Sequence, residues 1–252
     1  MKRAIVAALV AGVAATSSGA SFAAADAPGF YVFAGVGYQF PGEASVRSVD
    51  PGNNTSIFGN TIKGSGDDGA AYRVGGGYRV NPWLRTDVFL GYGSFEYHGT
   101  VLNTHVSADV SFFGGGVNGY IDFQGLTRTD LLGFEPYVGV GVGVVRTLVT
   151  SPRADFDLAP GTQNRSPSGT RVNPAFALYA GTGLRVARFI DQAPRNLVID
   201  IGYSYMHLGK AGAGAGIINN FTNGVPTGSF PDPGTEGEAA SNAINFVVRW
   251  EF

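Results

Sequence analysis

The chain of 252 residues contains no cysteine, few charged residues and no long apolar run outside its N-terminus. Without cysteine it can form neither a disulfide nor a thiolate metal site. Charged residues make up 14% of the chain and the formal net charge is −2. The basic stripe that a nucleic-acid-binding surface needs is therefore missing, and we expect no nucleic-acid partner.

The N-terminal apolar run covers residues 4–15 and follows a short basic start. It is shorter than the ~20 residues that a helix needs to cross a bilayer. Small residues that suit cleavage follow it, and the layout is that of a secretory signal peptide. We predict that residues 1–25 are removed on export, by cleavage after Ala25 with Ala23 as the second choice. Residues 26–252 then form one mature domain.

What the sequence has in quantity is glycine, 39 residues, often in segments where apolar residues recur at every second position. The clearest segment is the end of the chain, residues 241–252. One face of this strand is apolar, and the other carries Arg249 and Glu251. A soluble sheet would turn the apolar face inward to a core, whereas a membrane barrel turns it outward to lipid. The apolar set is Ile244, Phe246, Val248, Trp250 and Phe252.

The position of this strand favours the membrane barrel, because it ends the chain on an aromatic residue. Residues 245–252 resemble the closing strand of bacterial outer-membrane β-barrels. Residues 30–40 and 199–209 resemble the first and seventh strands of the eight-stranded family that includes OmpA-type transmembrane domains, opacity-like proteins and small porin-family surface proteins of Gram-negative bacteria. The resemblance implies an all-β, transmembrane, antiparallel up-and-down β-barrel of about eight strands in the outer membrane. It also implies a C-terminal signal for the barrel-assembly machinery, formed by Phe246, Trp250 and Phe252.

Seven further segments show the same alternation. Within one of them, the sequence of residues 107–116 does not indicate which side chains point inward and which outward, so their register stays open. An even strand count places both termini on the periplasmic side. Ten strands remain an alternative, because 98–106 is short for an outer loop and 124–134 is long for a periplasmic turn. The seven segments are 29–38, 71–80, 84–92, 107–123, 136–145, 176–186 and 199–205.

Three stretches lack a sustained period and are rich in Gly, Asn, Ser and Pro: residues 42–69, 150–172 and 210–240. Barrels of this class have short periplasmic turns and long extracellular loops. We therefore predict three long outer loops that offer contacts to a surface ligand. Outer-membrane lipid and lipopolysaccharide are the other expected partners.

The outward positions hold hardly any charge in mid-strand, and aromatic residues collect near the strand ends, as in interfacial belts. The predicted lower belt is Tyr78, Trp83, Phe123, Phe189 and Trp250, and the predicted upper belt is Tyr38, Tyr72, Tyr92 and Tyr205.

The inward positions alternate glycine with Tyr and Phe and carry charges of both signs. Buried charges must be paired, and an eight-stranded barrel is narrow enough to be filled by its own side chains. We therefore predict an ion-pair network that plugs the lumen. The alternative is a set of solvated charges lining an open pore. The predicted network is Arg73, Arg79, Arg85, Asp87, Asp122, Arg185, Asp200, Arg249 and Glu251.

Little in the sequence indicates chemistry. The deacylase members of the eight-stranded barrels carry a His-x-Ser pair, but here His207 is followed by Gly209 where that serine would stand. His98 and His105 flank a loop without a third metal ligand at suitable spacing. We predict a non-enzymatic protein without cofactor or metal, with a plugged lumen, a structural role in the envelope and surface-exposed interaction loops. The first alternative is a narrow channel for small solutes or apolar molecules, and the second is a lipid-A-modifying enzyme.

Overall fold

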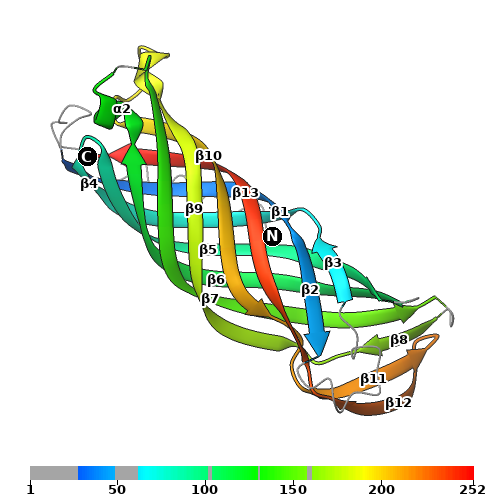
Figure 1. Ribbon diagram of the computed structural model, residues 1–252. Helices are drawn as coiled ribbons and strands as arrows, with labels where there is room; N and C mark the ends of the chain where they lie inside the picture. Colours follow the sequence, from blue (N-terminus) through cyan, green and yellow to red (C-terminus); the bar gives the residue numbers. More distant parts are fainter. Residues whose placement is uncertain (1–27, 49–61, 102–103, 130, 158–160) are drawn as a thin grey trace.

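The computed structural model describes residues 28–48, 62–101, 104–129, 131–157 and 161–252. The predicted signal peptide lies outside these residues. Most of the described chain is β-strand, and the strands run side by side in an elongated structure (Figure 1). In the described part of the chain, no helix has the length and apolar character to cross a membrane.

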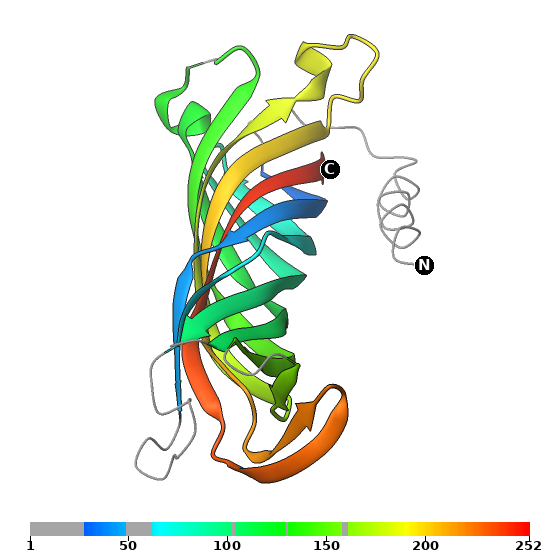
Figure 2. The same ribbon diagram turned by 90° about the vertical axis from the view of Figure 1, so that its right-hand side faces the viewer.

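Eight strands form a closed antiparallel ring, seen along its side in Figure 1 and turned in Figure 2. The ring closes where the last strand pairs with the first, with Tyr31 opposite Glu251 and Pro41 opposite Ser241. The predicted all-β up-and-down barrel is confirmed, with eight strands in the ring rather than ten. In ring order the strands are β1 (Gly29–Pro41), β4 (Gly69–Asn81), β5 (Leu84–Val101), β6 (Thr104–Asp122), β7 (Phe134–Phe156), β9 (Gly169–Arg185), β10 (Leu197–Ala211) and β13 (Thr235–Glu251).

Five short strands extend the wall at the end away from the C-terminus, towards the lower right of Figure 1. They are β2 (Glu43–Ser48), β3 (Ile62–Gly66), β8 (Thr162–Arg165), β11 (Gly216–Thr222) and β12 (Val225–Asp232). The hairpin of β2 and β3 fills the wall between β13 and β5, and β8 pairs with both β7 and β11. We call this part of the molecule the outer extension.

The outer extension corrects the prediction of three long loops. Most described residues of 42–69, 150–172 and 210–240 belong to strands, either to the five short ones or to the ends of β7, β9, β10 and β13. Residues 49–61, within the first stretch, lie outside the described residues. Alternation failed as a signal here because above the lipid the outer face of a strand meets water and need not be apolar. In β3, for example, only Ile62 is apolar and buried, while Lys63 and Ser65 are exposed.

Two other uncertain segments are also resolved. Through residues 107–116, β6 keeps its even-numbered residues inward at Val110 and Phe112 and its odd-numbered residues outward at Asp109 and Phe113. Opposite Ser107, an irregularity in β7 at Ser151, where φ is 52°, shifts the register. The periplasmic turn before β7 is indeed long, and it contains the short helix α2 (Phe123–Thr127).

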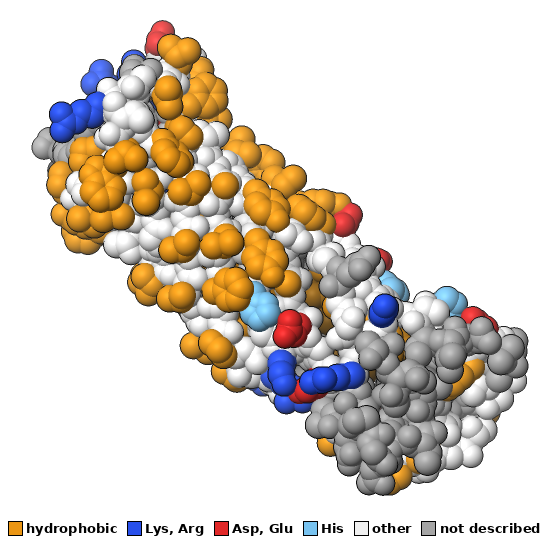
Figure 3. All heavy atoms as spheres, viewed as in Figure 1, with side chains coloured by type: hydrophobic (Ala, Val, Ile, Leu, Met, Phe, Trp, Pro, Cys, Tyr) orange, Lys and Arg blue, Asp and Glu red, His pale blue; other side chains and the backbone are white. Residues whose placement is uncertain are grey.

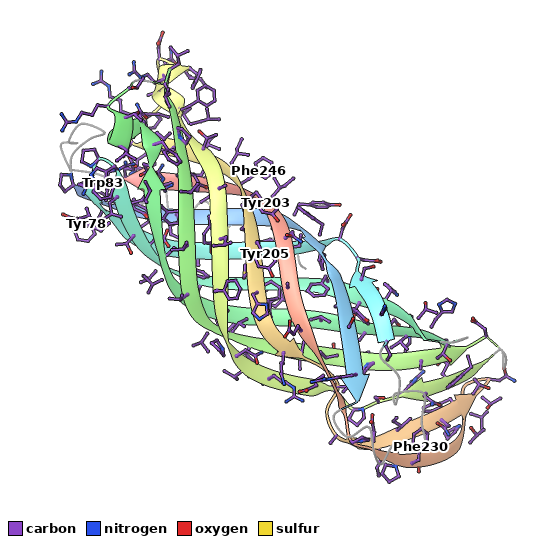
Figure 4. All side chains as sticks on the ribbon, in the orientation of Figure 1. Tyr78, Trp83, Tyr203, Tyr205, Phe230 and Phe246 are labelled. Carbon is purple, nitrogen blue, oxygen red and sulfur yellow. The ribbon has the colours of Figure 1, made fainter. Side chains whose placement is uncertain are left out.

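The outer wall of the ring carries a broad band of exposed apolar side chains (Figure 3). On β7 the four valines at even positions from Val138 to Val144 are all exposed, and Val140 is 62% exposed. Tyr78 and Trp83 lie at the end of the barrel that holds the C-terminus, whereas Tyr203 and Tyr205 lie further along the wall (Figure 4). Charged side chains also lie inside the barrel, near the periplasmic ends of the strands, where Arg85, Asp122 and Arg249 are buried.

Candidate functional site: the lumen

The inward side chains at the periplasmic ends of the strands come together in one charged layer. Because successive residues of a strand point to opposite faces, the inward set is fixed by the same alternation that turns the apolar residues outward. Seven of the eight ring strands contribute a charge. These are Arg79 from β4, Arg85 from β5, Asp122 from β6, Glu135 from β7, Arg185 from β9, Asp200 from β10, and Arg249 and Glu251 from β13.

Hydrogen-bonded ion pairs connect this layer. Arg85 Nε donates to Asp122 (3.0 Å), which also accepts from Arg79 Nη1 (3.3 Å). Arg79 Nη2 then donates to Glu251 (2.8 Å), which also accepts from Arg185 Nη2 (3.0 Å). Each of these carboxylates therefore bridges two arginines.

The chain of ion pairs continues through Glu135 and closes on itself. Glu135 accepts from Arg185 Nη2 (2.6 Å) and from Arg249 Nη2 (3.1 Å). Arg249 Nε donates to Asp200 (3.0 Å), and Asp200 lies 4.0 Å from Arg85 Nη2, where the circuit began. Positive and negative groups alternate around the circuit, four of each. We call these eight residues the charge ring.

Neutrality explains how the charge ring can be buried. Arg249 is 1% exposed, and Arg85, Asp122 and Asp200 are also buried. A buried charge without a partner costs several kcal/mol, whereas each group here is paired and hydrogen-bonded. The charge ring therefore places eight charged groups inside the barrel without leaving an excess of either sign.

Two of the nine predicted residues lie apart from the charge ring. Asp87 accepts hydrogen bonds from Asn118 Nδ2 (2.7 Å) and from the Tyr31 hydroxyl (3.4 Å). The Arg73 guanidinium lies over the rings of Phe33 and Tyr179, at 5.9 and 5.5 Å from their centroids. The sequence reasoning missed Glu135. Glu135 lies two residues before the inward Tyr137 and therefore points to the same face of the strand. The predicted strand began at Pro136 and so left it out.

Aromatic rings pack directly against the charge ring. Arg85 stacks on Tyr120 and Tyr137, at 4.6 and 4.5 Å from their centroids. Glycines on neighbouring strands make room for these rings. A Cβ at Gly139 would lie 2.4 Å from the ring of Tyr120, and one at Gly77 would lie 2.3 Å from the ring of Tyr31. A cavity of about 10 Å³ lies at this level beside Arg85, Asp200 and Arg249.

The other half of the lumen is apolar. Its wall is formed by clusters of buried side chains that include Phe112, Val145 and Leu208, and further out Tyr97 and Val110. Two cavities remain there, of about 60 and 80 Å³, and both are lined mainly by apolar and glycine residues. The lumen thus changes from a charged layer at the periplasmic end to an apolar chamber towards the outer extension.

The histidines lie away from the lumen. His207 stacks on the outward ring of Phe176, with 4.9 Å between centroids, and Gly209 has a positive φ of 74° at a bulge. His98 contacts Asp67 and Glu96 at 3.4 and 3.5 Å. Among the described residues, no three metal-ligating side chains are grouped.

Outside the membrane, His105 contacts Asp157 at 3.5 Å. Near the outer ends of β10 and β13, Lys210 Nζ donates to both carboxylate oxygens of Glu236 (3.2 and 3.1 Å), and this hydrogen bonding lowers the pKa of Glu236.

The residues of the predicted assembly signal share the outer face of β13. Phe246 and Phe252 are exposed, while Trp250 is partly covered. The backbone N–H of Phe252 donates to the Phe30 carbonyl (2.9 Å), which joins the last residue to the first strand. Whether the assembly machinery reads these side chains stays a prediction.

A closed ring of eight strands, apolar outside and charged within, defines an integral β-barrel of the bacterial outer membrane. The family model described as "Outer membrane protein beta-barrel domain" matches residues 5–252, and the chain belongs to this family. The expected outer-membrane location is thereby confirmed.

Two solved outer-membrane proteins show the same fold at TM-scores of 0.50 or more, and a third is similar at a lower score. The outer membrane protein OprG from Pseudomonas aeruginosa is 15% identical, with a TM-score of 0.53, 89% of this chain covered and 97% of that one. The outer membrane protease OmpT from Escherichia coli is 8% identical, with a TM-score of 0.50 and the same two coverages. Neisserial surface protein A is 18% identical, with a TM-score of 0.40, covering 90% of this chain and all of that one. No curated protein matches the chain. Because the fold is shared with a protease, fold alone does not separate enzyme from non-enzyme.

Proposed function

We propose that this protein is a non-enzymatic barrel with a closed lumen, which stabilises the outer membrane and presents the outer extension to the surroundings of the cell. The charge ring carries this proposal, because its eight groups pair with one another across the lumen, and the cavity beside Arg85, Asp200 and Arg249 has a volume of only about 10 Å³. A conducting pore needs solvated charges, whereas these side chains use their hydrogen bonds on one another. His207 and Gly209 offer no nucleophile beside the imidazole, which supports the absence of lipid-A chemistry.

The proposed partners follow from the same geometry. Lipid and lipopolysaccharide surround the apolar band, and the barrel-assembly machinery inserts the chain. A surface ligand would bind the outer extension, whose exposed apolar side chains include Ile217 and Val225. These residues lie on paired strands, so a ligand would meet a fixed surface.

Single-channel recording tests the closed lumen. Purified protein reconstituted into a planar bilayer is expected to give no steady conductance steps, because the charge ring blocks the route for ions. A general porin recorded in the same bilayers is the positive control. Steady, reproducible steps from the folded protein would contradict the proposal and favour a channel.

The apolar chamber favours a second candidate, the uptake of small apolar molecules. Its wall is mainly apolar, and one of its two cavities is lined in part by Ala44, Val46 and Ile62 of the outer extension. Since the charge ring closes the periplasmic end, such a molecule would have to leave sideways, through the wall and into the membrane.

Filling the chamber tests this second candidate. Ala108→Trp places a large ring among Tyr97, Val110 and Val149 and is expected to slow the uptake of toluene by cells that express the protein. Thr150→Trp, on the outer face of β7, is the matched control. Equal uptake by the two variants and the parent would contradict this role.

A further inference from the structure

Two periplasmic turns on one side of the barrel expose large apolar side chains. One turn joins β6 to β7 and contains α2, and the other joins β9 to β10 and contains the 3₁₀ turn η3 (Val186–Arg188). The exposed fractions of these side chains range from 37% to 80%. We call them the periplasmic patch, and its members are Leu126, Leu131, Leu132, Phe134, Phe189 and Ile190.

The two turns are joined into one unit. The rings of Phe134 and Phe189 meet edge to face with centroids 5.9 Å apart. The backbone N–H of Arg185 donates to the carbonyl of Gly133 (3.1 Å). Gly133 has a φ of 87°, and a Cβ there would lie 2.9 Å from Cβ of Arg188. The periplasmic patch is therefore held by packing and backbone bonding between the turns.

Leu132 is hard to explain if water surrounds the patch. It is 80% exposed, the largest fraction among the exposed apolar residues. Its φ of 59° lies in the left-handed region, which is unfavourable for a residue with a Cβ. In water, neither the left-handed backbone conformation nor the exposure of Leu132 lowers the free energy of the folded protein. In a hydrocarbon environment, the side chain recovers the free energy of burial.

The periplasmic patch continues the lipid-facing wall. Phe134 is the first residue of β7, and its side chain lies on the same outer face of the strand as those of Val138 and Val140. Figure 3 shows apolar side chains both on the barrel wall and on the turns at its upper end. The third periplasmic turn, between β4 and β5, is shorter and contains Pro82 and the exposed Trp83.

The same turns carry an excess of basic side chains. Arg128, Arg188 and Arg195 are exposed, and Asp191 is the exposed acid among the described residues of these turns. Asp130 lies outside the described residues. Arginine next to an apolar surface at a membrane interface attracts anionic lipid headgroups, and its aliphatic stem can cover apolar surface.

We propose that the periplasmic patch is a phospholipid-binding site that inserts into the periplasmic leaflet of the outer membrane, where its arginines select anionic headgroups. Continuity with the lipid-facing band indicates a lipid rather than a protein occupant, and the basic excess indicates a phosphate-bearing anionic lipid.

Fluorescence quenching tests the insertion. Because the chain has no cysteine, Leu132→Cys can be labelled selectively with an environment-sensitive fluorophore and reconstituted in phosphatidylcholine vesicles. The matched control is Ser229→Cys on β12, an exposed position of the outer extension. The label at position 132 is expected to be quenched by spin-labelled lipid and protected from iodide present on both sides, with the reverse at position 229. A gel shift on boiling verifies that both variants are folded.

Lipid selectivity is tested with the same label. At equal amounts, spin-labelled phosphatidylglycerol is expected to quench position 132 more strongly than spin-labelled phosphatidylcholine, by about five-fold in local concentration for one arginine. Arg128→Gln with Arg195→Gln is expected to remove this preference while quenching by lipid persists. Quenching by iodide alone at position 132, as a water-exposed or protein-binding patch would give, overturns the insertion. Equal quenching by the two lipids overturns the selection of anionic headgroups.

Discussion

Replacing Arg249 with methionine is expected to lower the free energy of unfolding by about 3–5 kcal/mol, the cost of breaking a buried ion pair by removing one partner. Arg249 donates to Asp200 (3.0 Å) and Glu135 (3.1 Å) and also contacts Glu251. Without it, three carboxylates share the remaining arginines of the charge ring. Urea titration of the folded protein in detergent micelles or bilayers measures the change.

An exposed ion pair provides the control for this prediction. Arg47 contacts Glu236 at 3.5 Å, and its side chain is 71% exposed. Exposed pairs contribute about 0–1 kcal/mol, so Arg47→Met is expected to leave the urea midpoint nearly unchanged. Similar losses in the two variants would mean that the charge ring is solvated, which would also remove the main support for a closed lumen.

Replacing Val140 with arginine is expected to reduce insertion into the membrane strongly. Val140 is 62% exposed in the middle of the apolar band on β7, and an arginine at the midplane of that band costs about 2–4 kcal/mol. The folded fraction after dilution from urea into lipid vesicles, read from the gel shift on boiling, measures the effect.

Thr150→Arg is the matched control, since it places the same charge on the same face of β7 beyond the apolar band. Val140→Ala controls for the loss of the valine side chain. If Arg at 140 and Arg at 150 insert equally well, the outer face of β7 does not meet lipid. Gly139→Ala is unsuitable as a mild comparison, because the added Cβ would meet the ring of Tyr120 at 2.4 Å.

The sequence was informative wherever two different environments lie on the two sides of a strand. Where the outer face of a strand meets lipid and the inner face meets the charge ring, residues such as Val140 and Arg249 differ strongly in polarity from their neighbours in the sequence. The alternation along the strand is then enough to predict which of them point outward and which inward. Glu135 was missed because Pro136 was taken as the start of its strand. Had the predicted strand been extended by one residue, from Pro136 to Glu135, the number of acids would have equalled the number of arginines in the charge ring.

Other features depend on three-dimensional packing that no local pattern reports. Arg73 and Asp87 have the right parity for the charge ring, but their height along the barrel gives them Tyr179 and Asn118 as neighbours instead. The apolar chamber was not anticipated, because Val110 and Phe112 lie in a stretch of β6 without clear alternation. Of the periplasmic patch, only Phe189 was expected at the interface, since Leu132 lies in a turn whose residues show no period.

The outer extension has a consequence for how this protein can diversify. Its hairpins continue the backbone ladders of the barrel, so their contour depends on main-chain pairing more than on the side chains they carry. Substitutions at exposed positions such as Ser229 could then change the chemistry met by an antibody or a phage while the shape of the surface is preserved. The side chains that an outside partner contacts would therefore change during evolution, while the backbone that carries them keeps its shape.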